Sequence, residues 1–206
     1  MNARRWTGIA VACLMGVLAC LPVGAVTFTD TDGYGIQYTA TVEPQSGSVY
    51  SVSVTIDTTG YTGSQTARLD WFRLKLSPQS PASVTNLNLP AGYSYGGTSG
   101  GGIIIQTPDV GPPSMTPDGN EIVIPTSGTK PVILFGFWVD LNNTHLMTDG
   151  WPYQARYLFQ KPEGGYKNDI ISRNMQPQGG VIPEPATLVL FGMGLVAPLA
   201  ARWRKP

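Results

Sequence analysis

The sequence predicts an all-β protein, an antiparallel β-sandwich of about eight strands, with helices only at its two hydrophobic ends. Between residues 26 and 182 apolar and polar residues alternate with a period of two, and helical periodicity is almost absent. Turn signals such as Asp-Gly and Ser-Gly separate these segments at short intervals. Many short strands without helical crossovers favour an antiparallel sandwich.

The chain begins with the three regions of a secretory signal peptide in residues 1–25. Two arginines give a positive start, residues 9–21 contain no charge, and a Val-Gly-Ala sequence supplies the small residues of a cleavage site. We therefore expect an N-terminal signal-peptide helix, export by the Sec machinery, and cleavage between Ala25 and Val26.

Two other signals use the same residues. Arg4 and Arg5 could form a twin-arginine signal, and Cys20 could be acylated in a lipobox, but the flanking residues fit both motifs poorly. A plain cleavable signal is the favoured interpretation. Both cysteines, Cys13 and Cys20, lie within it, so the mature protein would contain no disulfide and no cysteine–metal site.

The first two strands are predicted from strict alternation in residues 36–42 and 50–56. In each segment, β-branched or aromatic residues on one face alternate with Ser, Thr or Gln on the other, which is typical of a half-buried strand. Pro44 and Gly47 lie between the segments, so we expect them to pair as a hairpin.

The next strand, residues 67–76, contains a change of phase. Ala67, Leu69 and Trp71 share one face, whereas from Phe72 onward the apolar residues fall on the other. A one-residue β-bulge at Trp71/Phe72 would turn both halves toward the core. A strand buried on both faces explains the pattern equally well, and the sequence leaves both open.

Five further strands are predicted at Ser83–Leu89, Gly102–Thr107, Glu121–Pro125, Pro131–Asp140 and Ala155–Gln160. Residues 132–139 are apolar throughout, which suits a central strand covered on both faces. Trp71 and Trp138 lie in strands and are expected in the core. Tyr93–Gly102 and Asp109–Gly119 are rich in glycine or proline and are expected to be loops.

The β domain is expected to span residues 26–173, and residues 174–180 resemble a flexible spacer. Five of the thirteen basic residues lie in the two ends of the chain, but only one of the thirteen acidic residues does. The region 26–182 therefore has eight basic and twelve acidic residues and a net charge of about −4. This charge argues against nucleic acid or an anionic membrane as a partner.

Residues 181–206 form a three-part tail. It consists of Pro183, Glu184 and Pro185, an uncharged apolar run at residues 186–201, and a basic cluster of Arg202, Arg204 and Lys205. Sixteen helical residues at ~1.5 Å each span about 24 Å, somewhat less than the ~30 Å of a bilayer core. We expect a short transmembrane helix at 186–201, with the basic cluster on the cytoplasmic side.

This tail resembles the PEP-CTERM sorting signal, which is similar in layout to the tails that sortases cut. The resemblance is confined to the C-terminal 26 residues. It implies an exosortase as partner, transient anchoring in the inner membrane, and a final location at the cell surface or outside the cell. The two prolines hold the backbone extended and resist helix formation, which suits a segment that an enzyme must grip.

Candidate catalytic groups are few. His145 is the one histidine, and no serine stands in a nucleophile motif. Asp30-Thr31-Asp32-Gly33 resembles part of a calcium loop, but acidic turn residues that bond their own backbone are the favoured interpretation. We expect no enzyme activity, no cofactor and no metal site.

The sequence therefore predicts a non-enzymatic, exported surface or extracellular-matrix protein, and the resemblance implies a biofilm setting. One alternative is a carbohydrate-binding module, because four aromatic residues fall near glycines or prolines where a ring could stack on a sugar. These four are Tyr93, Tyr95, Trp151 and Tyr153. Exopolysaccharide is then the expected ligand. A secreted hydrolase is the second alternative.

Overall fold

Eleven antiparallel strands form one continuous hydrogen-bonded order in the computed structural model, which describes residues 25–108, 116–142 and 144–178. The order is β5-β9-β3-β2-β1-β11-β10-β4-β7-β6, with β8 paired to β4. The strands are β1 (Val26–Thr31), β2 (Gln37–Ser46), β3 (Val49–Asp57), β4 (Ala67–Lys75), β5 (Ser83–Asn88), β6 (Ser94–Ser99), β7 (Gly102–Gln106), β8 (Ile122–Ile124), β9 (Val132–Asp140), β10 (Trp151–Gln160) and β11 (Tyr166–Gln178). The described residues contain no helix.

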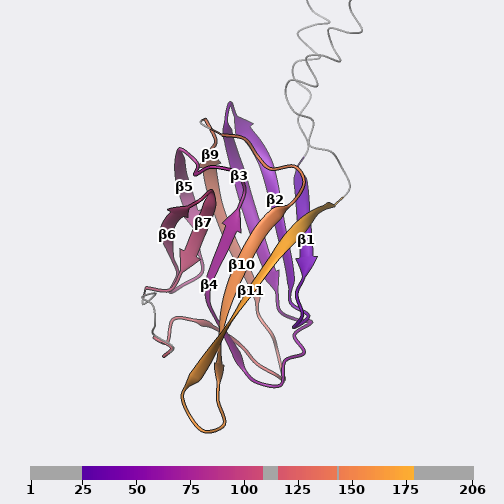
Figure 1. Ribbon diagram of the computed structural model, residues 1–206, viewed down its shortest axis with the longest axis vertical. Coiled ribbons are helices and arrows are strands. Elements are labelled where there is room, and N and C mark those ends of the chain that lie inside the picture. Colours follow the sequence, from indigo (N-terminus) through magenta and orange to yellow (C-terminus); the bar gives the residue numbers. More distant parts are fainter. Residues whose placement is uncertain (1–24, 109–115, 143, 179–206) are drawn as a thin grey trace, which may run out of the picture. The chain divides into compact units, whose positions relative to one another are not determined.

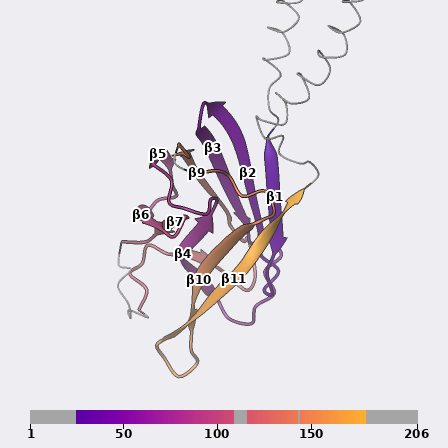
Figure 2. The ribbon, with the colours of Figure 1, turned by 45° about the horizontal axis from the view of Figure 1, so that its top comes forward.

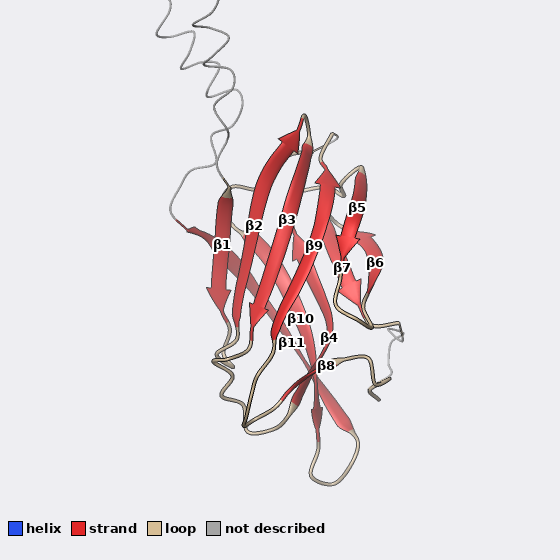
Figure 3. Ribbon diagram, turned by 180° about the vertical axis from the view of Figure 1, so that it is seen from behind, coloured by secondary structure: helices blue, strands red, loops and turns tan. Residues whose placement is uncertain are grey.

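The sheet folds over so that two layers face each other (Figures 1 and 3). One layer is β5-β9-β3-β2-β1, and the other is β11-β10-β4-β7-β6 with β8. Pairing of β1 with β11 joins them along one edge, where the two strands lie side by side (Figure 2). Aromatic rings meet between the layers: Phe28 stacks on Trp151 at 4.0 Å, and Phe72 stacks on Phe135 at 5.9 Å between ring centroids.

The predicted class, all-β and antiparallel, is confirmed, but the number of strands is larger than eight and the two layers are parts of one sheet. The predicted hairpin is β2–β3, in register from Gln37 opposite Asp57 onward. Three strands were not expected: β1, β6 and β11. The glycines of β6 made Tyr93–Gly102 look like a loop. Because β11 continues to Gln178, the prediction of a spacer is wrong for residues 174–178.

The phase change in β4 is a β-bulge. Leu69 lies opposite Tyr157 and Trp71 lies opposite Arg156, so Asp70 is the extra residue on this strand. The bulge sits one residue before the predicted position. It keeps Leu69 and Phe72 in the core at 0% and 1% exposure and leaves Trp71 half-buried on the outer face. The expectation that Trp71 belongs to the core is therefore wrong.

Strand β9 is not covered on both faces, as its apolar sequence had predicted. Its inner residues are buried, but Val132, Leu134 and Trp138 on the outer face are 52%, 62% and 38% exposed. Trp138 lies opposite Ser51 of β3 and Thr85 of β5. The outer face of β9 is thus an apolar strip between hydroxyl-bearing strands, and Trp138 is not a core residue.

The two predicted hydrophobic segments, the signal-peptide helix and the transmembrane helix at 186–201, lie outside the described residues. In the part of the chain that the structure describes, no helix is long and apolar enough to cross a membrane. The expected cleavage point between Ala25 and Val26 falls where β1 begins.

Gly35 of the β1–β2 turn lies in close contact with Gly60 of the segment after β3. A Cβ on Gly35 would lie 2.3 Å from the carbonyl oxygen of Gly60, and Gly35 has a φ of +78°. We expect Gly35→Ala to lower the free energy of unfolding by about 1–3 kcal/mol through backbone strain alone, and by more through the clash. Gly33→Ala, in the same turn with nothing within 4 Å of its Cβ, is the control. Urea unfolding that gives the two variants equal stability would contradict this close packing.

Candidate functional site

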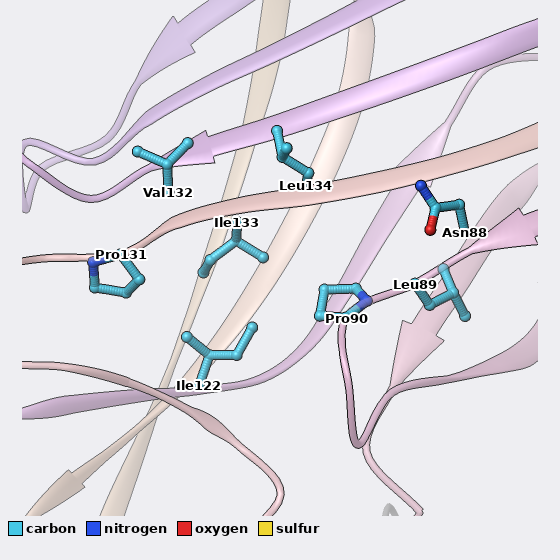
Figure 4. A pocket seen from close by; sticks show the side chains of 8 residues that line it. All are labelled: Asn88, Leu89, Pro90, Ile122, Pro131, Val132, Ile133 and Leu134. Carbon is cyan, nitrogen blue, oxygen red and sulfur yellow. The ribbon is translucent and has the colours of Figure 1, made fainter.

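A hollow of about 310 Å³ lies between β9 of one layer and β8 of the other (Figure 4). We call it the seam hollow. It is lined by Asn88, Leu89, Pro90, Ile122, Pro131, Val132, Ile133 and Leu134. Apart from the amide of Asn88 these side chains are apolar, and none can titrate. The seam hollow therefore offers no general acid or base.

A second hollow, of about 450 Å³, crosses the outer face of β4, β10 and β11, which lie side by side in Figure 1. We call it the outer groove. It is lined by Arg73, Lys75, Pro152, Tyr153, Gln154, Ser172, Arg173 and Asn174. Strand alternation positions the cations of β4, because Phe72 and Leu74 enter the core and leave Arg73 and Lys75 on the opposite face.

Polar contacts hold several of these side chains. Arg73, Gln154 and Ser172 lie opposite one another on three strands, and the Gln154 amide donates to the Ser172 hydroxyl at 2.9 Å. The Arg73 guanidinium donates to the backbone carbonyl of Ser99. The bond between Gln154 and Ser172 orients the middle of the outer groove. The Arg73 guanidinium lies over Gly102 of β7, toward β6, and Lys75 is the next outward residue of β4.

Arg173 of β11 lies opposite the core residue Tyr153 of β10, so its side chain is on the inner face of the sheet. There it binds Asp30 of β1, with its Nε and Nη2 atoms 2.6 Å and 3.2 Å from the two carboxylate oxygens. The Tyr153 hydroxyl donates to the same carboxylate at 2.9 Å. Burial raises the pKa of Asp30, but the bonds from Arg173 and Tyr153 outweigh it and hold the pKa below its ordinary value. Asp30 is therefore ionised and committed to this pair at neutral pH.

The possible calcium fragment is a bonded turn. One Asp32 carboxylate oxygen accepts the backbone N–H groups of Tyr34 and Ile36 at 2.8 and 3.0 Å, and the other accepts the Tyr38 hydroxyl at 3.0 Å. Burial raises the pKa of Asp32 despite these bonds. Because the Tyr38 hydroxyl donates to Asp32, the Tyr157 hydroxyl beside it must donate to Tyr38.

Elsewhere in residues 25–108, 116–142 and 144–178, no three His, Cys, Asp or Glu side chains are grouped as a metal site requires. His145 is exposed in the loop between β9 and β10. The sorting-motif residues Pro183–Pro185 and the basic cluster Arg202, Arg204 and Lys205 lie outside the described residues.

A buried ion pair adjoins Trp71: Asp70 precedes it in β4, and Arg156 lies opposite it on β10. Arg156 Nε lies 3.2 Å from Asp70 Oδ2, and the two side chains are 9% and 8% exposed. The Thr107 hydroxyl donates to the other Asp70 oxygen at 3.1 Å. Burial raises the pKa of Asp70 above its ordinary value, although Arg156 and Thr107 act against this. The pair anchors the bulge that turns Trp71 outward.

The four predicted sugar-stacking residues do not form a site. Trp151 and Tyr153 lie in β10, not in loops, and are 0% and 1% exposed. Tyr93 is 9% exposed and donates its hydroxyl to the Leu69 carbonyl. A ring packed in this way has no free face for a sugar. Tyr95, in β6, is the one member of this set that is half-exposed.

Sequence reasoning missed the residues of the outer groove except Tyr153. The phase change in β4 was the available signal, because a bulge re-aims the side chains that follow it. It indicated either a bulge or a strand buried on both faces, and Trp71 was expected in the core. The partners on β10 and β11 carried no signal, because β11 was not recognised as a strand.

The comparison with known protein families finds a match at the C-terminal end of the chain. Residues 181–205 match the family model of the PEP-CTERM protein-sorting motif. This agrees with the tail identified from Pro183, Glu184 and Pro185, and the chain carries this sorting signal. No curated protein and no solved structure matches the chain.

Proposed function

We propose that this protein is exported, processed by an exosortase at Pro183–Pro185, and placed at the cell surface or in the extracellular matrix, where its β domain acts without catalysis. The observation that carries the proposal is the sorting motif at residues 181–205, which begins three residues after β11 ends at Gln178. The Sec machinery delivers the chain, and the inner membrane holds it until processing.

The chemistry of the two hollows supports a non-catalytic role. The seam hollow has no titratable lining residue, and the outer groove is lined by cations, amides, two hydroxyl-bearing residues and a proline. General acid–base catalysis requires a donor and an acceptor whose pKa values lie near the working pH. Turnover of glycosides, esters or peptides by the purified protein would overturn this part of the proposal in favour of a hydrolase.

Processing gives the direct test of sorting. We expect replacement of Pro183 and Pro185 together by Ala to prevent processing and leave the protein in the inner membrane. Alanine would let a helix in the apolar run extend outward and close the backbone that the exosortase must reach. Intact-mass measurement of membrane and released fractions detects this as loss of the shortened form.

Pro162→Ala is the matched control, because Pro162 precedes Glu163 as Pro183 precedes Glu184 but lies exposed in the β10–β11 turn. It should be processed normally. A released wild-type protein whose mass still includes all residues through Pro206 would show that the tail is not cut.

Carbohydrate binding is the second candidate function. The outer groove supports it, whereas the set of four aromatic residues predicted from sequence does not. Amide and hydroxyl side chains line the groove, and the half-buried ring of Trp71 lies on the same face of β4. A side-chain amide can donate a hydrogen bond to one sugar hydroxyl through its NH2 group and accept one from another through its carbonyl oxygen. An aromatic ring packs against the apolar face of a sugar. Binding of the purified protein to its host's exopolysaccharide tests this candidate.

A further inference from the structure

The outer groove carries positive charge on an acidic domain. Arg73 and Lys75 of β4 supply this charge, and none of the lining residues is a carboxylate. Arg173 of β11 lies opposite Tyr153, so its side chain is on the inner face and does not contribute. Asp30 neutralises Arg173 through two hydrogen bonds. The charges of Arg73 and Lys75 therefore remain for a ligand, whereas region 26–182 has about four more acidic than basic residues.

The shape of the groove suits an extended chain. It is open, and its walls come from three adjacent strands, so a ligand lies across β4, β10 and β11 and does not enter the core. Gln154 and Ser172 hold each other in the middle, and Asn174 lies opposite Pro152 at one end. Polar groups that are already bonded lose little side-chain freedom when a ligand binds.

An aromatic ring, that of Trp71, lies on the same face of β4 but beyond the residues that line the outer groove. Trp71 precedes Arg73 by two residues, so the two side chains share the outer face and are ~7 Å apart along β4. This spacing is about the length of one sugar ring. The bulge at Asp70 is the reason that the ring faces outward, and the buried Asp70–Arg156 pair fixes the bulge. Bulges that re-aim a side chain next to a binding site are a recurrent device in sheets.

From these observations we infer that the outer groove binds an acidic polysaccharide. Carboxylates of uronic acid units pair with Arg73 and Lys75, hydroxyls bond Gln154 and Asn174, and one sugar ring stacks on Trp71. Guanidinium and ammonium groups are the usual partners of carboxylates, and Arg can bind both oxygens at once. The inference rests on the second candidate function, glycan binding, and adds the charge of the glycan and the residues that select it.

The test uses the full-length chain in a non-ionic detergent and calorimetric titration with three polymers. Polygalacturonate is an acidic glycan, dextran a neutral glycan, and polyglutamate an acidic polymer without sugar rings. We expect binding of polygalacturonate that weakens in high salt, and much weaker binding of dextran and polyglutamate. The double variant Arg73→Gln/Lys75→Gln should bind polygalacturonate at least tenfold more weakly.

The control removes two positive charges elsewhere. Lys161→Gln/Lys167→Gln alters the far end of the β10–β11 hairpin and should bind as the wild type does. Trp71→Ala should weaken binding of polygalacturonate without changing the residual binding of polyglutamate, because only the glycan stacks. Circular dichroism confirms that each variant is folded.

The outcomes separate the two proposals. Equal or tighter binding of dextran would overturn the inference and leave glycan binding standing. Equal binding of polyglutamate, or equal weakening in the control variant, would show a nonspecific response to anions and overturn it. If the protein binds none of the three polymers, the inference is overturned. A separate binding measurement with the host's own exopolysaccharide then tests the second candidate function.

Discussion

Replacing Arg156 with Ala is expected to lower the free energy of unfolding by about 3–5 kcal/mol, because it leaves the Asp70 carboxylate buried without its cation. The two side chains are 9% and 8% exposed, so water cannot take the place of the guanidinium. The β4 bulge would loosen with the pair. Urea unfolding of the variant and the wild type measures the loss.

The pH dependence gives this prediction a second readout. Burial already raises the pKa of Asp70, and removing Arg156 would raise it further. A carboxyl whose pKa is raised in the folded state adds stability below its unfolded pKa of 3.8, and this contribution is lost as the pH rises through the folded pKa. The deficit of Arg156→Ala should therefore be largest near neutral pH and shrink toward pH 3.8.

Arg173→Ala is the matched control, because it breaks the ion pair with Asp30 but its side chain is 45% exposed. We expect a loss of about 0–1 kcal/mol, as for other exposed pairs. Equal losses in the two variants would mean that the Asp70–Arg156 pair is no more important to the fold than a surface contact.

Trp151→Ala is expected to cost about 3–5 kcal/mol, since Trp151 is fully buried and stacks on Phe28. Its indole N–H also donates to the Met147 carbonyl at 2.9 Å, which would be left without this donor. The mutation removes the ring that packs β10 against β1. Thermal and urea unfolding should both show a destabilised protein.

Trp138→Ala is the control, because its ring is 38% exposed on the outer face of β9, and a change within about 0.5 kcal/mol is expected. The comparison also tests function. If Trp151→Ala kept full stability and lost glycan binding, the sugar-stacking role predicted from sequence would be correct and its core role wrong.

Alternation was a reliable guide where β-branched and aromatic residues faced one side and hydroxyls the other, as in β2 and β3. It failed for β11, where polar residues fill both faces because much of this strand is exposed. It also failed for β6, where Gly96 and Gly97 accommodate a register shift between Tyr95 and Gly97. Glycine in a sequence usually indicates a turn, but these two glycines lie within an edge strand at the point where its pairing is irregular.

The candidate site was predicted less well than the fold, and the tryptophans show why. Sequence assigns a residue to one of two strand faces but does not say which face another layer covers. Trp151 and Tyr153 looked like loop residues because Pro152 and Gly150 adjoin them, yet β10 starts at Trp151. Trp138 looked like a core residue because its neighbours are apolar. Only the pairing of the strands decides these cases.

Strand β11 also determines how the domain would respond to mechanical load. A tensile force applied beyond Gln178 runs along β11, whose hydrogen bonds to β10 lie perpendicular to the strands. The ten residue pairs between β10 and β11 would therefore be loaded in shear and share the force, instead of opening one after another. Because the outer groove lies on the same strands, tension between a C-terminal tether and a bound polymer would pass through this pair of strands and bypass β5, β9 and β3.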